Sequence, residues 1–175
     1  MSNIKFNLDI PKIGDFILYR KPASDFFGNQ IKKEQLKKGF SPKKAEFTHI
    51  ETSWGGPQAV SVVPPKTKII DITKAHKGRY VRIVRYHKYK GNRERYRVAL
   101  WSTSLANLGY DWFGVLKFRI RFLFHSRGKF FCSENAAWAL TKEFEDAFGD
   151  LKPYQIMPAH FLGEEFDLVW EGIIE

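Results

Sequence analysis

The only cysteine in this chain of 175 residues, Cys132, lies in the run KFFCSENAAWAL (129–140), directly before residues typical of a helix start. Ser133, Glu134 and Asn135 favour a helix N-terminus, and the apolar residues that follow have helical spacing (Ala136, Ala137, Leu140, Phe144 and Phe148). Unpaired N–H groups and the positive end of the helix dipole favour a thiolate there, and the thiolate is the nucleophilic form. The same N–H groups can stabilise an oxyanion, so Cys132 is a candidate nucleophile and Ser133 a candidate oxyanion residue. The alternative is a buried cysteine that only fills space.

A thiol nucleophile needs a base, and the chain contains five histidines, at positions 49, 76, 87, 125 and 160. His49 differs from the others because it lies inside FTHIETS (47–53), a predicted strand, and a rigid strand can hold an imidazole against a helix end. Any of these histidines taken alone is more often structural than catalytic. A single cysteine with a histidine elsewhere in the chain is the expected layout of a cysteine nucleophile site, so the pair Cys132 and His49 predicts nucleophilic catalysis.

The elements that have to position this pair follow from the residue pattern along the chain. β-Branched and aromatic residues between turn residues predict strands at 16–19, 47–53, 59–63, 68–72 and 80–86. Helices are predicted at 29–38, 93–107 and 133–148, and a further one between residues 112 and 124. Strands concentrate in the middle of the chain and helices in its second half. This order predicts an α+β fold with an antiparallel sheet packed against helices.

The length of the chain suits one well-buried core, since 43% of its 175 residues are hydrophobic, and we expect residues 1–175 to form a single domain. One cysteine allows no intramolecular disulfide, and no run approaches the roughly 20 apolar residues of a membrane-spanning helix. The N-terminal residues MSNIKFNLDIPKIGD contain no continuous apolar run either. These features predict a soluble, cytoplasmic protein without a signal peptide or a transmembrane segment.

The formal net charge of +10 is concentrated in one segment, residues 77–97. Nine Lys or Arg residues lie there against one acid, Glu94, with tyrosines interleaved between them. Such a segment can follow a nucleic-acid backbone or another polyanion. No zinc-finger or RRM signature accompanies it, so a solvated surface is the preferred interpretation. The acidic C-terminal stretch from Gly163 is expected to pack against this basic surface or to offset its charge.

Four segments together resemble a known family of enzymes. They are GDFIL (14–18), THIETSWGGPQAVS (48–61), GYDWFG (109–114) and FFCSENAAWAL (130–140). In content and order they are similar to the circularly permuted papain-like, NlpC-related cysteine hydrolases of the YaeF/YiiX type, and the resemblance spans most of the chain. The histidine segment precedes the cysteine segment here, whereas it follows in unpermuted papain-like enzymes. The resemblance implies a circularly permuted papain-like fold over residues 1–175 and thiol chemistry that uses no cofactor and no metal.

Carried over residue by residue, the resemblance makes Cys132 the nucleophile and His49 the general base. The residue that orients the imidazole has two candidates. Ser61 lies at the family's position after the glycine turn, whereas Glu51 lies two residues after His49, on the same face of the predicted strand. A carboxylate stabilises an imidazolium by charge as well as by hydrogen bond, which favours Glu51 by chemistry. Tyr110 matches the family's tyrosine before the cysteine, and its hydroxyl is a candidate oxyanion donor.

The resemblance implies a hydrolase that forms a thioester acyl-enzyme on an amide or ester carbonyl, with an amidase or peptidase as the leading expectation. Its substrate would be a peptide, a cell-wall peptide or a lipid. A lipid or ester acyltransferase on the same fold is the first alternative. The second is a non-catalytic module that binds nucleic acid or another polyanion through residues 77–97. The third is an inactive protein that keeps the fold, which a serine at position 61 allows.

Overall fold

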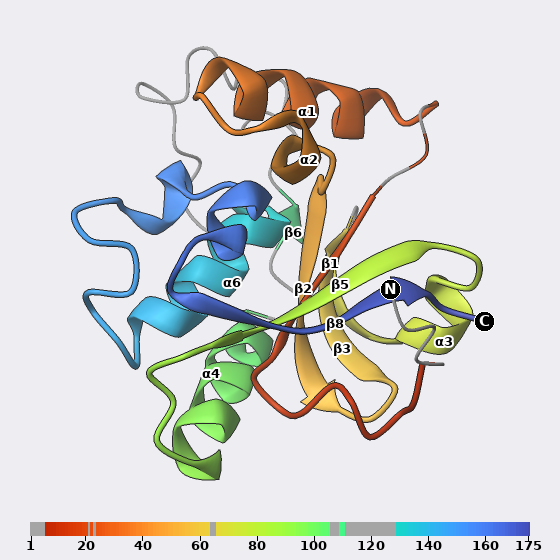
Figure 1. The fold of residues 1–175 in the computed structure, drawn as a ribbon. Coiled ribbons are helices and arrows are strands. Elements are labelled where there is room, and N and C mark those ends of the chain that lie inside the picture. The colour runs from red at the N-terminus through yellow and green to blue at the C-terminus, as the bar shows by residue number, and fades with distance from the viewer. Residues whose placement is uncertain (1–5, 21, 23, 64–65, 106–108, 111–128) are drawn as a thin grey trace.

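The computed structural model of the protein describes residues 6–20, 22, 24–63, 66–105, 109–110 and 129–175, which form an α+β fold around one sheet (Figure 1). Its strands are β1 (Phe16–Tyr19), β2 (His49–Gly55), β3 (Gln58–Val63), β4 (Lys66–Asp71), β5 (Tyr80–Tyr86), β6 (Gly109–Tyr110), β7 (Lys129–Phe130) and β8 (Phe166–Ile173). They are ordered β7-β6-β4-β3-β2-β1-β5-β8. Neighbouring strands are antiparallel except for β6 and β7. The predicted antiparallel sheet is therefore confirmed everywhere but at this short parallel edge.

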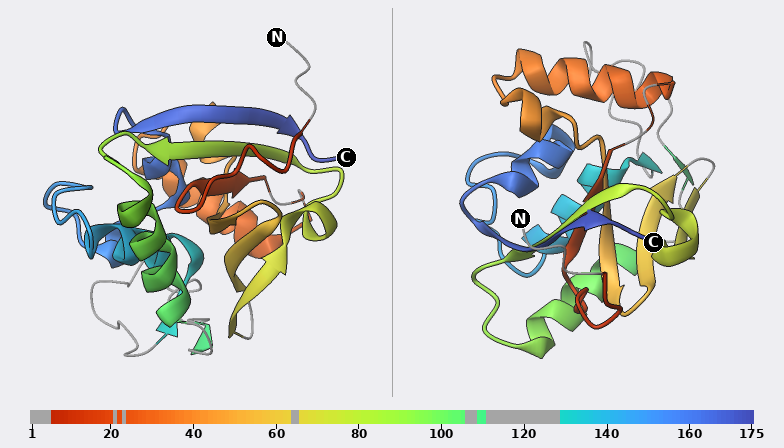
Figure 2. Two further views of the ribbon diagram at one scale, coloured as in Figure 1. Left: turned by 90° about the horizontal axis from the view of Figure 1, so that it is seen from below. Right: turned by 45° about the vertical axis from the view of Figure 1, so that its right-hand side comes forward.

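Helices pack around the sheet: α1 (Phe26–Lys37), α2 (Pro42–Ala45), α3 (Ile72–Ala75), α4 (Asn92–Ser104) and α6 (Cys132–Thr141), with the 3₁₀ turns η1 (Pro153–Gln155) and η2 (Pro158–Leu162). α4 and α6 pack against each other and against β2 and β3, while α1 and α2 lie beyond the start of β2 (Figure 1, Figure 2). None of the described helices is long and apolar enough to cross a membrane.

β1 connects the two halves of the core. Its sequence, FILY, has no charged residue, and all four side chains are buried. Because successive side chains of a strand point to opposite faces, Phe16 and Leu18 join the apolar cluster against α4 and α6. Ile17 and Tyr19 join the cluster that contains Trp170 on the other face. A short apolar run without polar alternation is typical of such a strand, covered on both faces.

The predicted strands are confirmed, with the expected bounds at 16–19 and 80–86 and shifts of one or two residues in the others. α1 begins at Phe26, before the predicted start at residue 29. The reason is an N-cap: the Asp25 carboxylate accepts a hydrogen bond from the Gly28 N–H at 2.6 Å. The helix predicted between residues 112 and 124 lies outside the described residues.

The helix after Cys132 is shorter than predicted. It ends at Thr141, so the prediction that it continues to Phe148 is wrong. Phe144 packs on Tyr86, with ring centroids 5.0 Å apart, and Phe148 packs on Phe161 at 5.1 Å. These aromatic contacts with other elements hold both side chains outside the helix, although their spacing along the chain is helical.

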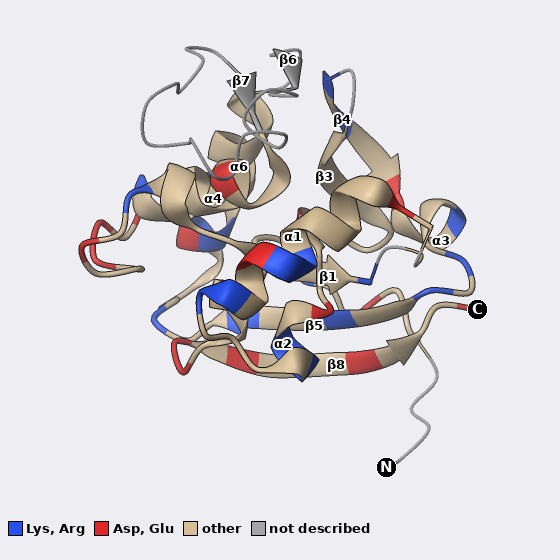
Figure 3. Cartoon of the chain, turned by 90° about the horizontal axis from the view of Figure 1, so that it is seen from above, with Lys and Arg blue, Asp and Glu red and all other residues tan. Residues whose placement is uncertain are grey.

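The acidic C-terminal stretch forms β8, a strand that the residue pattern did not predict. β8 pairs with β5, so its carboxylates lie beside cations of the basic segment (Figure 3). Arg82 Nε, for example, donates to Glu171 at 2.8 Å, which confirms the expected offset of charge. Five of the nine cations in residues 77–97 have a carboxylate partner: Arg82–Glu171, Arg85–Asp15, Lys88–Asp146, Arg95–Asp15 and Arg97–Glu143. Much of the charge of this segment is therefore neutralised within the fold.

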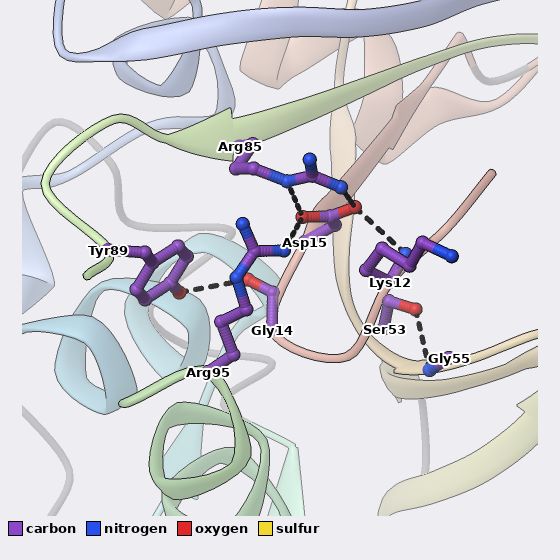
Figure 4. Close-up of polar contacts among 8 residues, drawn as sticks. All are labelled: Lys12, Gly14, Asp15, Ser53, Gly55, Arg85, Tyr89 and Arg95. Carbon is purple, nitrogen blue, oxygen red and sulfur yellow. Dashed lines mark hydrogen bonds and ion pairs between the residues drawn. The ribbon is translucent and has the colours of Figure 1, made fainter. Parts of the chain in front are cut away.

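Asp15, directly before β1, has a fully buried carboxylate held by two arginines (Figure 4). Arg85 Nε and Nη2 donate to its two oxygens at 2.8 Å each, and Arg95 Nη1 lies 3.6 Å from Oδ1. Gly14 has a φ of +79°, and a Cβ at this position would lie 2.8 Å from the backbone of Arg95, so only glycine fits. We call Asp15, Arg85 and Arg95 the arginine clasp. It anchors the start of β1 to β5 and α4.

Candidate active site

Three of the predicted site residues lie together on one face of the sheet. His49 is the first residue of β2, and the alternation of side chains along a strand places Glu51 on the same face. β3 pairs with β2 so that Ala59 lies opposite Ser53, and the same antiparallel register places Ser61 opposite Glu51. His49 is 2% exposed, and the other two are 1% exposed. The structure therefore brings His49, Glu51 and Ser61 together away from bulk water.

Both candidate orienting groups face the same nitrogen of His49. Ser61 Oγ lies 3.5 Å from His49 Nε2, and Glu51 Oε1 lies 3.7 Å from it. Both distances exceed the roughly 2.7–3.2 Å of a normal N–H···O hydrogen bond. The position of the two side chains therefore does not favour Ser61 over Glu51, because an oxygen of each lies beside the same nitrogen. Nδ1 is the nitrogen on the other side of the ring.

A second histidine, His76, belongs to this group, and the residue pattern did not single it out. It follows α3, is 3% exposed, and its Nε2 lies 2.8 Å from Glu51 Oε2. Glu51 thus lies between two imidazoles, and we call His49, Glu51 and His76 the glutamate–histidine cluster. No periodicity marks His76, because it lies in the turn after a four-residue helix. The one available signal was its residue type.

Tyr19 packs against both histidines of the cluster. Its Cα pairs with that of His49 across β1 and β2, and its ring centroid lies 4.8 Å from His49 and 4.1 Å from His76. Burial raises the pKa of the Tyr19 phenol far above its ordinary value, and electrostatic interactions with Glu51 and Cys132 raise it further. The phenol therefore stays protonated. Cys132 thus acts electrostatically on Tyr19, the residue whose ring packs against both histidines.

Cys132 is the first residue of α6, which confirms its predicted position at a helix N-terminus. It is 3% exposed and belongs to the apolar cluster that includes Leu18 and Ile50. Along β1 and β2 these two residues directly neighbour Tyr19 and His49, which point to the other face of the strands. No capping hydrogen bond from a side chain is found at the N-cap of α6 among the described residues. The first N–H groups of the helix lie at the positive end of its dipole.

The two predicted oxyanion residues differ in what they contact. The hydroxyl of buried Ser133 donates a hydrogen bond to the Ile156 carbonyl at 2.7 Å, so this side chain holds α6 in place. Its backbone N–H is the part of Ser133 that can serve an oxyanion. Tyr110 lies in β6, where its backbone pairs with Phe130, two residues before Cys132. The side chain of Tyr110 lies outside the described residues.

Gln35, from α1, connects the two halves of the site. Its amide nitrogen donates to the Ala45 and Phe47 carbonyls at 3.0 and 3.1 Å, directly before β2. Its amide oxygen accepts a hydrogen bond from the Ala159 N–H at 2.8 Å, close in the chain to the Ile156 carbonyl that supports α6. One buried side chain thereby ties the entry of β2 to the segment beside the start of α6.

The remaining histidines lie apart from this site or outside the described residues. His87 is exposed and stacked on Tyr86. His160 Nδ1 accepts a hydrogen bond from the Met157 N–H, and burial lowers the pKa of its imidazole. His125 is not among the described residues. Within the described ranges, no group of three or more His, Cys, Asp or Glu side chains is arranged to hold a metal ion.

No protein-family model matches the chain, and no curated protein sequence does. Among solved structures, the fold is similar to the crystal structure of metalloprotein yiiX from Escherichia coli O157:H7, DUF1105. This likeness has a TM-score of 0.64 at 13% sequence identity and covers 93% of this chain and 98% of the other. The expected likeness to a YiiX-type protein is therefore confirmed at the level of the fold, which is what similarity at so low an identity establishes.

Proposed function

We propose that the protein is a cysteine-dependent hydrolase of amides, an amidase or peptidase with a circularly permuted papain-like arrangement of its site. Cys132 is the nucleophile and His49 the general base. The observation that carries the proposal is the order of groups around the His49 ring. Oxygens of Ser61 and Glu51 face Nε2. We assign the other ring nitrogen, Nδ1, to the thiol at the start of α6. The likeness of the fold to a YiiX-type protein supports the resemblance from which both roles are carried over.

In the proposed reaction, the Cys132 thiol gives its proton to His49 Nδ1, and the sulfur attacks the carbonyl carbon of the substrate. N–H groups at the N-terminus of α6 stabilise the tetrahedral oxyanion. His49 then gives the proton to the leaving amine, and the C–N bond breaks to leave a thioester on Cys132. Water, deprotonated by His49, attacks the thioester, so that the carboxylic acid and the free thiol are released.

Glu51 and Ser61 have different tasks in this scheme. Whenever His49 takes up a proton, its ring becomes a cation, and its Nε2–H faces both oxygens. Glu51 stabilises that cation by charge, whereas the Ser61 hydroxyl accepts a hydrogen bond without charge, which is typically about half as strong. Both interactions are stronger here than in water, because the residues are buried.

The Escherichia coli protein is described as a metalloprotein, which raises the question of a metal in this site. The glutamate–histidine cluster has suitable residue types, since two imidazoles and a carboxylate suit zinc. One donor pair of the cluster is already engaged internally, because Glu51 Oε2 and His76 Nε2 lie 2.8 Å apart. Within the described residues no metal-binding group is formed. The residues present therefore do not fit a metal ion, and the proposed steps use none.

Two alternatives differ in how well the structure supports them. An acyltransferase would share every step up to the thioester and differ only in the group that accepts the acyl chain. A polyanion-binding module is less well supported, because five of the nine cations in residues 77–97 already have carboxylate partners. If that segment bound a polyanion, retention on heparin would fall steeply with salt.

The hydrolase proposal is tested by intact-mass measurement after treatment with an activated ester, p-nitrophenyl acetate, and with an epoxide probe. The wild type is expected to gain an acetyl group as a thioester, Cys132→Ala to gain none, and His49→Ala to react far more slowly. His87→Ala, at an exposed histidine, is the matched control and should react like the wild type. Equal labelling of Cys132→Ala and wild type would contradict the proposal.

A further inference from the structure

The two oxygens of Glu51 are held unequally by the two imidazoles beside it. Oε2 lies 2.8 Å from His76 Nε2, a normal hydrogen-bond distance, whereas Oε1 lies 3.7 Å from His49 Nε2. Oε1 has no hydrogen-bond partner among the described residues, and neither has His76 Nδ1, although both atoms are buried. Buried polar atoms without partners are uncommon in folded proteins, so this pair requires a reason.

The protonation of His76 follows from these contacts. An ionised carboxylate can only accept, so the hydrogen of the short contact belongs to His76 Nε2. In a doubly protonated ring, Nδ1–H would be a buried, charged donor with no acceptor among the described residues, which costs more than a bare neutral acceptor. His76 is therefore assigned as the neutral Nε2–H tautomer. Glu51 then keeps its negative charge for the other imidazole.

We propose that His76 is a positioning residue of the active site, a role that rests on the hydrolase function proposed above. Its N–H holds one oxygen of Glu51, and this contact fixes the other oxygen in front of His49 Nε2. Tyr19 keeps both rings in place because it packs against each. When His49 receives the thiol proton, its Nε2–H meets a carboxylate that is already oriented. The ring already carries a hydrogen on Nε2 before the step, so protonation at Nδ1 adds a positive charge and makes the interaction between Nε2–H and Oε1 charge-assisted.

Loss of the His76 N–H would leave Glu51 as a buried carboxylate whose Oε2 has lost its donor. Such a group is unfavourable, and it responds by taking up a proton or by turning toward another donor. Either response removes negative charge from the position in front of His49. The expected result is slower formation of the thioester while the thiol itself is retained.

The test compares two amides that differ in reach. In His76→Gln, the side-chain nitrogen lies near the position of Nε2 and can donate to Glu51, whereas in His76→Asn it stops near the position of Nδ1. The rate of acetylation of Cys132 by p-nitrophenyl acetate is followed by intact mass. We expect the acetylation rate of His76→Asn to be about ten- to a hundredfold lower than that of the wild type, as when other groups that orient a functional side chain are removed. His76→Gln should stay close to the wild type.

A second measurement adds His76→Asn to Glu51→Gln, which replaces the carboxylate by a neutral amide. Because His76 is proposed to act through Glu51, the double variant should be no slower than Glu51→Gln alone, whereas independent effects would multiply. Thermal melts give the folded fraction, so that each rate refers to folded protein. His87→Asn, at an exposed histidine, is the matched control and should react at the wild-type rate.

The outcomes separate this inference from the function on which it rests. Equal rates for His76→Gln and His76→Asn, or multiplied losses in the double variant, would overturn the role of His76 and leave the hydrolase proposal standing. Absence of Cys132 acetylation in the wild type would overturn both. The positioning role would be supported by slow acetylation of His76→Asn, a wild-type rate for His76→Gln, and a double variant no slower than Glu51→Gln alone.

Discussion

Two buried carboxylates flank β1, and they are held in different ways. Asp15, directly before the strand, is fully buried, and each of its oxygens accepts an Arg85 N–H at 2.8 Å (Figure 4). Glu51, on the neighbouring β2, is 1% exposed and faces imidazoles at 2.8 and 3.7 Å, with Oε1 lacking a hydrogen-bond partner among the described residues. Burial is nearly the same at both places, so the partners make the difference.

The comparison separates a network that holds the fold from one that can respond to a proton. A guanidinium is always charged, and its hydrogen bonds to Asp15 raise the pKa of Arg85 further, so the arginine clasp is saturated and permanent. Imidazoles change charge near neutral pH, and the glutamate–histidine cluster still has an unused acceptor. Tyr19, which packs against both histidines of the cluster, has its pKa raised in part by Cys132. Buried polar groups that lack hydrogen-bond partners are typical of functional sites.

The largest effect should come from removing the proposed catalytic pair. His49→Ala should lower ester turnover by about a thousandfold or more, as removal of a base does in comparable sites. Cys132→Ala and the double variant should be almost equally inactive, because members of one catalytic unit are far from additive. Turnover of p-nitrophenyl acetate by the three variants checks this. Losses that multiply in the double variant would make His49 a bystander and leave the cluster without a catalytic role.

The next effect should fall on stability instead of reactivity. Asp15→Ala leaves a partly buried Arg85 without its counter-charge, which should lower the free energy of unfolding by about 3 kcal/mol. The acetylation rate of Cys132, counted per folded molecule, should remain that of the wild type. Urea denaturation measures the first quantity and intact mass the second.

Asp150→Ala, at an exposed acid, is the control for the loss of one negative charge. A stability as high as that of this control would show that the arginine clasp does not anchor β1. A slower acetylation of folded Asp15→Ala would break the distinction between the two networks.

A smaller loss of acetylation rate is expected when either of the two oxygens that face His49 is removed, and its size ranks their contributions. Glu51→Gln should slow acetylation of Cys132 by about tenfold or more, because it removes charge from an imidazolium that forms during the step. Ser61→Ala should cost less, since a hydroxyl offers only a neutral hydrogen bond. Parallel rate measurements and thermal melts of both variants check the order. Full turnover in both would leave Cys132 and His49 as a dyad.

The smallest effect is expected at Tyr19. Tyr19→Phe keeps the ring that packs against both histidines and removes a hydroxyl that stays protonated, so the acetylation rate should change little. Tyr19→Leu removes the aromatic wall and should slow the reaction more, because both rings lose their support. A Tyr19→Phe variant as slow as Tyr19→Leu would instead assign the phenol a direct part in the step.

The local residue pattern was sufficient to predict the parts of the site that lie on a single helix or strand. The capping residues after Cys132 predict a helix that starts at Ser133, and α6 starts one residue earlier, at the cysteine itself. The strand period of two places His49 and Glu51 on one face, and both contribute to one buried cluster. The strand FILY at 16–19 has its predicted bounds, because an apolar run between turns carries its own signal.

Contacts between elements could not be predicted from the residue pattern and became visible only in the tertiary structure. His76 lies in a turn without periodicity, and it meets Glu51 only because α3 folds back toward the sheet. Phe148 has helical spacing but lies outside the helix, where it packs on Phe161. The acidic end of the chain becomes a strand because β5 offers it a partner and cations. Periodicity along a chain encodes which face of an element is buried, whereas the choice of faces that meet depends on packing among elements far apart in sequence.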